Sequence, residues 1–71
     1  MKVSIFVLCK YGKYVSKQIE MSEKEFDQTK SLIEKINDLN FLNIDTEFGK
    51  VYFPANVIKD SVITLIVEQS A

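Results

Sequence analysis

The sequence lacks the residue types on which metal sites and activated nucleophiles are usually built. It contains no His, and Cys9 is its only cysteine. One cysteine cannot close a disulfide within the chain or form a thiolate metal site, and no imidazole is present to activate it. The sequence therefore predicts no metal, no cofactor and no catalytic residue. Cys9 is expected to be a small buried hydrophobic residue that is inert to thiol reagents.

Long hydrophobic runs and an excess of charge of one sign are also missing. The first apolar run extends only from Ile5 to Cys9, which is too short for a secretion signal. No segment approaches the about 20 apolar residues of a membrane-spanning helix. The sequence contains nine Lys and ten Asp and Glu residues, so its net charge is −1. It therefore lacks the basic surface of a nucleic-acid-binding protein. We expect a cytoplasmic protein that binds no membrane and for which nucleic acid is an unfavoured partner.

A length of 71 residues predicts a single domain over residues 1–71. A chain of this size buries only about 60% of the surface that it exposes when unfolded, so its core is small. Small domains usually gain stability from disulfides, a metal or a partner subunit. Because the first two are not expected here, the length favours association.

The N-terminal part reads as two strands over residues 2–9 and 13–20. Alternating apolar residues place Val3, Ile5, Val7 and Cys9 on one face of the first strand. A three-residue loop, Lys10-Tyr11-Gly12, ends on a Gly suited to a left-handed bulge, and it sets Val7 opposite Val15 and Val3 opposite Ile19. A two-residue Tyr-Gly loop would instead move the small aliphatic residues to opposite faces.

A helix is predicted from Ser22 to about Asn40. Ser22 and Glu25 have the spacing of a capping box. One apolar stripe follows at helical spacing, formed by Phe26, Thr29, Leu32, Ile33, Ile36 and Leu39.

Strands over residues 41–46, 51–53 and 61–68 follow the helix, with one helical turn between Pro54 and Asp60. The predicted fold is α+β, in the order β-β-α-β-β-β, with one helix packed across one face of an antiparallel sheet. A single helix covers only one face, the one that carries Val3, Ile5, Val7, Val15 and Ile19. The opposite face is then left with an apolar group that we predict to be an interface, formed by Phe6, Leu8, Tyr14, Val62 and Ile66. We expect a homodimer packed back to back through this face, or alternatively through paired strand edges.

The first hairpin also carries a small basic and aromatic patch, Lys10, Tyr11, Lys13 and Lys17. These residues are the candidates for contact with a partner or an anionic ligand. The acidic residues of the helix lie beside Lys residues on its outer side, which is typical of a solvated surface rather than of paired catalytic carboxylates.

Three segments stand out in the sequence: the KYGK hairpin, the MSEKEF helix start and the stretch VYFPANVIKDSVI. Together they resemble small uncharacterised proteins of phages and prophages from low-GC Gram-positive bacteria. The use of Lys without Arg fits such an AT-rich genome. The resemblance implies a small accessory factor that binds a host or phage component. The leading hypothesis is thus a non-enzymatic protein-binding protein; the alternative is a protein that binds or sequesters an anionic, nucleotide-like ligand at a subunit interface.

Overall fold

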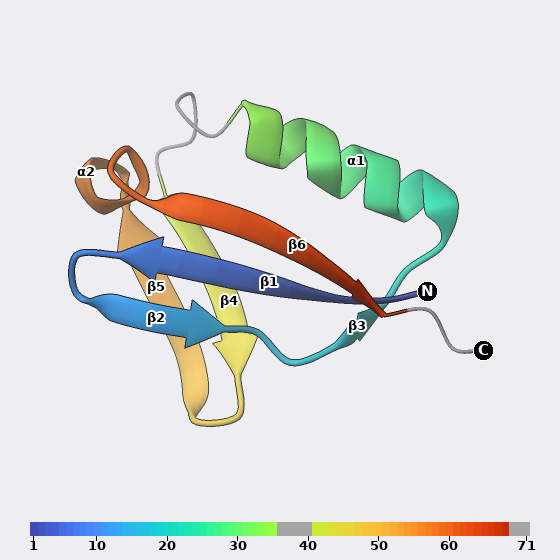
Figure 1. Cartoon of the computed structure of the whole chain (residues 1–71), viewed down its shortest axis with the longest axis horizontal. Helices are drawn as coiled ribbons and strands as arrows, with labels where there is room; N and C mark the ends of the chain where they lie inside the picture. The colour runs from blue at the N-terminus through green and yellow to red at the C-terminus, as the bar shows by residue number, and fades with distance from the viewer. Residues whose placement is uncertain (36–40, 69–71) are drawn as a thin grey trace.

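A computed structural model describes residues 1–35 and 41–68 (Figure 1). The elements follow in the order β1 (Lys2–Cys9), β2 (Gly12–Val15), β3 (Ile19–Glu20), α1 (Glu23–Glu34), β4 (Phe41–Thr46), β5 (Gly49–Pro54), α2 (Ala55–Ile58) and β6 (Val62–Glu68). The α+β class is confirmed. The strand predicted over residues 13–20 is divided into β2 and β3, and the helical turn expected after Pro54 is α2.

The described strands form two antiparallel sheets rather than the single sheet that the sequence predicts. In the first sheet β1 is central, with β2 and β3 along one side and β6 along the other. In the second sheet β4 pairs only with β5. Figure 1 shows this hairpin crossing behind β1 and β2. The second sheet therefore forms a layer over one face of the first.

The core lies between these two layers. Val7 of β1 packs in one cluster with Ile44 of β4, Phe53 of β5, and Val57 and Ile58 of α2. The sequence pattern predicts the long helix as the cover of this face, but the β4–β5 hairpin and α2 supply the buried residues. None of the residues of α1 from Glu23 to Glu34 is buried, and the helix lies beyond β6 in Figure 1.

The register of the first hairpin differs from the predicted one. Cys9 pairs with Gly12, so only Lys10 and Tyr11 form the loop, and Val7 lies opposite Tyr14 instead of Val15. Gly12 has a φ of 136°, a conformation that favours Gly because it has no Cβ. The positive φ was expected, but the loop is one residue shorter than predicted.

The predicted pairing of Val3 with Ile19 is nevertheless observed. Between β2 and β3 the chain has one residue more than the facing part of β1, which shifts the pairing back to the predicted one. The shift occurs at Ser16, which is the one buried polar side chain among the described residues. The Ser16 amide donates to the Ile5 carbonyl at 2.9 Å, and its Oγ accepts from the Ile5 amide at 2.8 Å. The next amide, of Lys17, turns to the Asp45 carbonyl of β4 at 2.8 Å. This local bulge interrupts the pairing with β1 after β2, and the pairing resumes at β3 with its register shifted by one residue.

The start of α1 matches the sequence analysis. The Ser22 Oγ accepts from the Glu25 amide and a Glu25 carboxylate oxygen accepts from the Ser22 amide, both at 3.2 Å. The two bonds complete a capping box and satisfy two amides at the helix start. The predicted extension to Asn40, with Ile36 and Leu39, lies outside the described residues.

Candidate functional site

The face of the first sheet that points away from the core carries a row of large apolar side chains. Phe6 lies opposite Val15 on one side, and Leu8 lies opposite Val62 on the other. Residues directly opposite each other on antiparallel strands point to the same face of the sheet. We call this surface the open face and define it by Phe6, Leu8, Val15, Val62 and Ile66.

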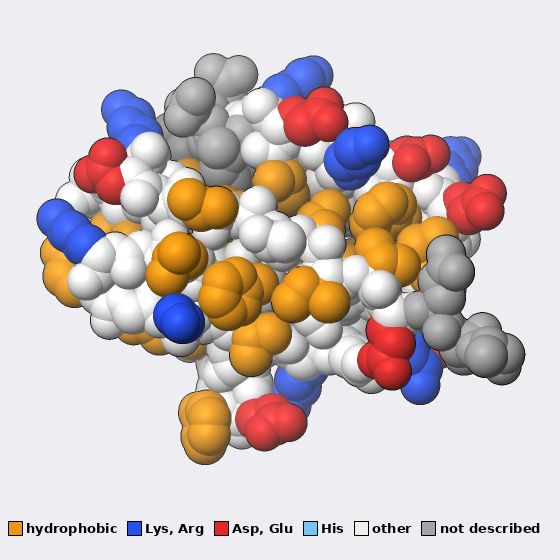
Figure 2. All heavy atoms as spheres, viewed as in Figure 1, with side chains coloured by type: hydrophobic (Ala, Val, Ile, Leu, Met, Phe, Trp, Pro, Cys, Tyr) orange, Lys and Arg blue, Asp and Glu red, His pale blue; other side chains and the backbone are white. Residues whose placement is uncertain are grey.

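These side chains are far more exposed to solvent than the side chains of the core. Val62 is 61% exposed, Val15 51% and Ile66 46%, whereas Val7 on the covered face is 1% exposed. Figure 2 shows hydrophobic side chains gathered across the middle of this face, over β1, β2 and β6. A contiguous apolar area of this kind on a folded domain marks an interaction surface.

The two ends of the open face carry opposite charge. At one end Lys13 lies opposite Leu8. At the other end Lys2 lies opposite Glu20 of β3 and also opposite Glu68 of β6, so one positive and two negative charges give that row a net charge of −1. The single salt bridge found among the described residues joins Lys50 to Asp45, elsewhere in the molecule, at 3.8 Å. The charges of the open face thus have no ion partner within the described chain.

Four of the five residues predicted as an interface come together on this face: Phe6, Leu8, Val62 and Ile66. The fifth, Tyr14, lies on the covered face, where its ring meets Phe53 edge to face with 5.4 Å between the ring centroids. The shorter hairpin loop is the reason, because it exchanges the faces of Tyr14 and Val15.

Val15 is therefore the residue of the open face that sequence reasoning missed. The signal that identifies it is the Gly after the second loop residue, which permits a two-residue connection. The alternation of the strand alone does not distinguish the two registers, since Tyr14 and Val15 are both suited to a sheet.

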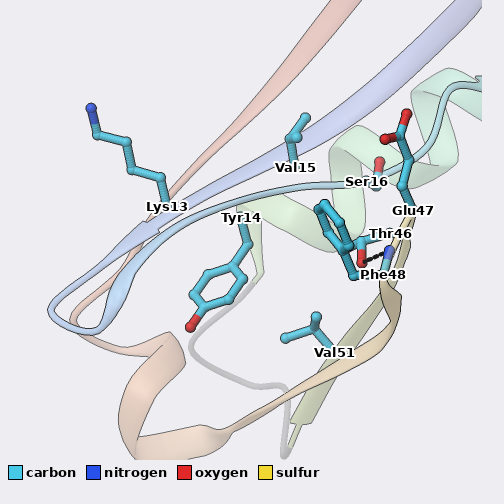
Figure 3. Close-up of a pocket in the computed structure, with 8 residues that line it drawn as sticks. All are labelled: Lys13, Tyr14, Val15, Ser16, Thr46, Glu47, Phe48 and Val51. Carbon is cyan, nitrogen blue, oxygen red and sulfur yellow. Dashed lines mark hydrogen bonds between the residues drawn. The ribbon is translucent and has the colours of Figure 1, made fainter.

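A hollow of about 330 Å³ lies next to the open face, between β2 and the turn of the β4–β5 hairpin. Its walls include Tyr14 and Val15 of β2 and Val51 of β5 (Figure 3). At the turn, the Thr46 Oγ1 accepts from the Phe48 amide at 3.1 Å and donates to the Gly49 carbonyl at 2.8 Å. This arrangement holds Phe48 at the rim with its side chain 99% exposed.

The predicted basic patch is not assembled around one cavity. The Lys10 ammonium lies 5.2 Å from the centre of the Tyr11 ring, within the range of a cation–π contact. Lys13 lines the hollow beside β2, whereas Tyr11 lines a second hollow of about 310 Å³ with Cys9 and Tyr52. Lys17 is exposed, and its main-chain amide donates to the Asp45 carbonyl of β4. These residues therefore surround the hairpin without converging on a common ligand position.

Cys9 lies on the covered face, as predicted, and is half-buried. Its thiol donates to the Gly12 carbonyl with an Sγ–O distance of 3.6 Å. No group of three or more potential metal ligands occurs in residues 1–35 and 41–68. Within the same ranges, no helix has the length and apolar character needed to cross a membrane.

Comparison with known proteins gives no relative from which a function can be transferred. No protein-family model, no curated protein and no solved structure matches the chain. The functional argument consequently rests on the geometry of the open face.

Proposed function

We propose that the protein is a non-enzymatic binding protein that acts through a protein–protein contact on the open face. The observation that supports this proposal is the contrast between the two faces of one sheet. One face is covered by the β4–β5 hairpin and α2, while the other exposes Leu8, Val15, Val62 and Ile66 as a connected surface. The resemblance of the sequence to small phage and prophage proteins supports the role of an accessory factor.

The open face gains enough for binding only when all of its apolar side chains are buried together. Full burial of a large aliphatic or aromatic side chain contributes about 1.5–3 kcal/mol. Since the five side chains are already partly covered, completing their burial contributes about 4–8 kcal/mol. Association costs about 4–15 kcal/mol in lost translational and rotational freedom. Binding therefore requires that all five side chains are buried at once. One charge in its centre should be enough to prevent binding.

The chemistry of the sequence is consistent with binding rather than catalysis. Cys9 has no His that could act as its base, and its thiol is directed to a main-chain carbonyl. The acidic residues of α1 are exposed on the outer side of the helix, where carboxylates behave as solvated charges.

A capture experiment tests the proposal. The tagged wild-type chain and its Ile66→Glu variant are immobilised and exposed both to the purified chain and to a lysate of the host. We expect the wild type to retain a stoichiometric protein and Ile66→Glu to retain none. Leu32→Glu on α1 is the matched control, because Leu32 is also exposed, at 56%, but lies away from the open face. Retention that depends on Leu32 and not on Ile66 would contradict the proposal.

The hollow beside β2 supports a second candidate function, binding of a small anionic ligand. Lys13, one of the residues expected near such a ligand, lines it together with Tyr14. Its volume of about 330 Å³ lies at the lower end of the range for small-molecule sites. A thermal-shift screen with nucleotides is the test, since a ligand that binds only the folded chain raises Tm. No shift at millimolar nucleotide would remove this candidate.

A further inference from the structure

The second hollow, of about 310 Å³, brings together all three tyrosines of the chain. Tyr11, Tyr14 and Tyr52 are the only Tyr residues in the sequence, and each of them lines it. Tyr11 comes from the loop after β1, Tyr14 from β2 and Tyr52 from β5, so the fold gathers them from distant parts of the chain. We call this site the tyrosine hollow. None of the residues that define the open face lines it, and it is therefore a separate surface.

The tyrosine hollow has a buried floor and an exposed rim. On the floor, Phe53 is 3% exposed and meets the Tyr14 ring edge to face. On the rim, Tyr11 and Tyr52 are each 66% exposed, and Pro54 is exposed two residues after Tyr52, on the same side of β5. Figure 1 shows the β1–β2 loop at the same end of the molecule as α2, which follows directly on Pro54. Packed rings beneath exposed rings make a preformed site.

The polar groups of the rim supply hydrogen-bond donors among apolar rings. They are the hydroxyls of Tyr11 and Tyr52 and the side-chain amide of Asn56. A segment in the polyproline II conformation has no internal hydrogen bonds, so its carbonyls are free to accept from such donors. Its Pro residues have no N–H and need no acceptor in return. Aromatic-lined grooves bind proline-rich segments in this way.

Charge distinguishes such a segment from a cationic ligand, which aromatic rings also bind. Among the described residues no Asp or Glu lines the tyrosine hollow. The Lys10 ammonium lies 5.2 Å from the centre of the Tyr11 ring, where it repels a second cation and attracts an acidic side chain. The charge at the rim therefore favours a neutral segment that carries an acidic residue at one end.

We propose that the tyrosine hollow binds a proline-rich segment of another protein in the polyproline II conformation, with an acidic residue beside the prolines directed to Lys10. The rings of Tyr11 and Tyr52 pack on the prolines, and their hydroxyls donate to the carbonyls of the segment. Such a segment is extended before it binds, so little conformational entropy is lost. This inference goes beyond the proposed function and does not depend on the open face.

Isothermal titration calorimetry of the full chain with an oligoproline peptide that ends in two Asp residues tests the inference. We expect saturable binding. Tyr11→Ala and Tyr52→Ala should each weaken it about tenfold or more, since each change removes a ring that packs on the peptide. Tyr52→Phe keeps the ring and should weaken it about threefold. Phe48→Ala is the matched control, because Phe48 is also an exposed aromatic residue, at 99%, but does not line the tyrosine hollow.

Two further measurements locate the peptide and test the role of charge. The sequence contains no Trp and the peptide has no aromatic residue, so a change in Tyr fluorescence on binding reports on the tyrosine hollow. Lys10→Glu should weaken binding of the acidic peptide about fivefold and leave binding of an uncharged oligoproline unchanged, because only the first peptide contacts Lys10.

Four results would overturn the inference. They are no binding at about 1 mM peptide, equal binding of a Gly-Ser peptide with the same two Asp residues, tighter binding of tetramethylammonium than of the peptide, and binding that survives Tyr52→Ala but is lost in Ile66→Glu. The second would leave charge alone as the contact, the third would make the hollow a cation site, and the fourth would place the peptide on the open face. Circular dichroism verifies the fold of each variant, and the comparison of the peptides on the wild type needs no variant.

Discussion

The two faces of the β2–β1–β6 sheet use nearly the same kinds of residues and have opposite environments. On one face Val7 is 1% exposed and packs against Ile58, itself 2% exposed. On the other, Val62 is 61% exposed and no described element lies over it. Composition therefore does not separate a core from an interface in a chain this small. The difference is made by the β4–β5 hairpin, which can cover only one face.

The largest expected effect concerns the covered face. Ile58→Ala removes three buried carbons from the centre of the core and leaves a cavity, so we expect a loss of about 2–5 kcal/mol in the free energy of unfolding. For a small domain this is a large share of the total stability. Urea denaturation is the measurement, and a loss below about 1 kcal/mol would show that the core is not at α2.

The second-largest effect on the free energy of unfolding is expected at the loop between β1 and β2. This loop decides which residues of β2 lie on each face of the sheet. Gly12→Ala forces a residue with a Cβ to adopt a φ of 136°, at a cost of about 1–2 kcal/mol. No atom lies within 4 Å of the added Cβ, so the cost comes from the backbone alone. Gly49 has the same conformation and the same open space, and Gly49→Ala is the matched comparison. Equal losses in urea denaturation support the shared turn geometry; a neutral Gly12→Ala would contradict it.

A smaller effect is expected at α1, none of whose residues from Glu23 to Glu34 is buried. Ser22→Ala removes one half of the capping box and should cost about 1 kcal/mol. Because α1 lies away from the open face, retention in the capture experiment should not change once the folded fraction is accounted for. Thermal melting with a parallel capture experiment checks both statements, and an unchanged Tm would argue against the cap.

The smallest effect on folding should come from the open face itself. Val62→Ala removes two carbons from a side chain that is 61% exposed, so its cost to the monomer should stay within about 0.5 kcal/mol. The measurement is urea denaturation at low protein concentration, so that any self-association does not contribute. A loss comparable with that of Ile58→Ala would mean that the open face is covered within the monomer.

Local features of the fold were predictable from the sequence, whereas the layer arrangement was not. Ser22 and Glu25 predict the helix start, and Pro54 predicts the end of β5 and the turn of α2. Both predictions succeed because these residues act on their immediate neighbours. The register of β3 against β1 depends on the bulge at Ser16, where a side-chain hydroxyl takes the place of a main-chain partner. Ser16 gives no signal of this in the sequence. Most of the open face was found from alternation, whereas Tyr14 and Val15 were exchanged because the hairpin loop is one residue shorter than predicted.

The position of β6 has a consequence for solubility. Among the described strands it pairs only with β1, and its stretch Val62-Ile63-Thr64-Leu65-Ile66-Val67 combines strong β-propensity with no charge and no Pro, the composition of segments that assemble into cross-β fibrils. Asp60 and Glu68 border this stretch, in the manner of the charged gatekeepers that flank unavoidable hydrophobic strands. The same six residues that give the open face its β6 side chains would, in the unfolded chain, be an aggregation-prone segment. Pairing of this strand with β1 occupies one of its edges and so opposes such assembly.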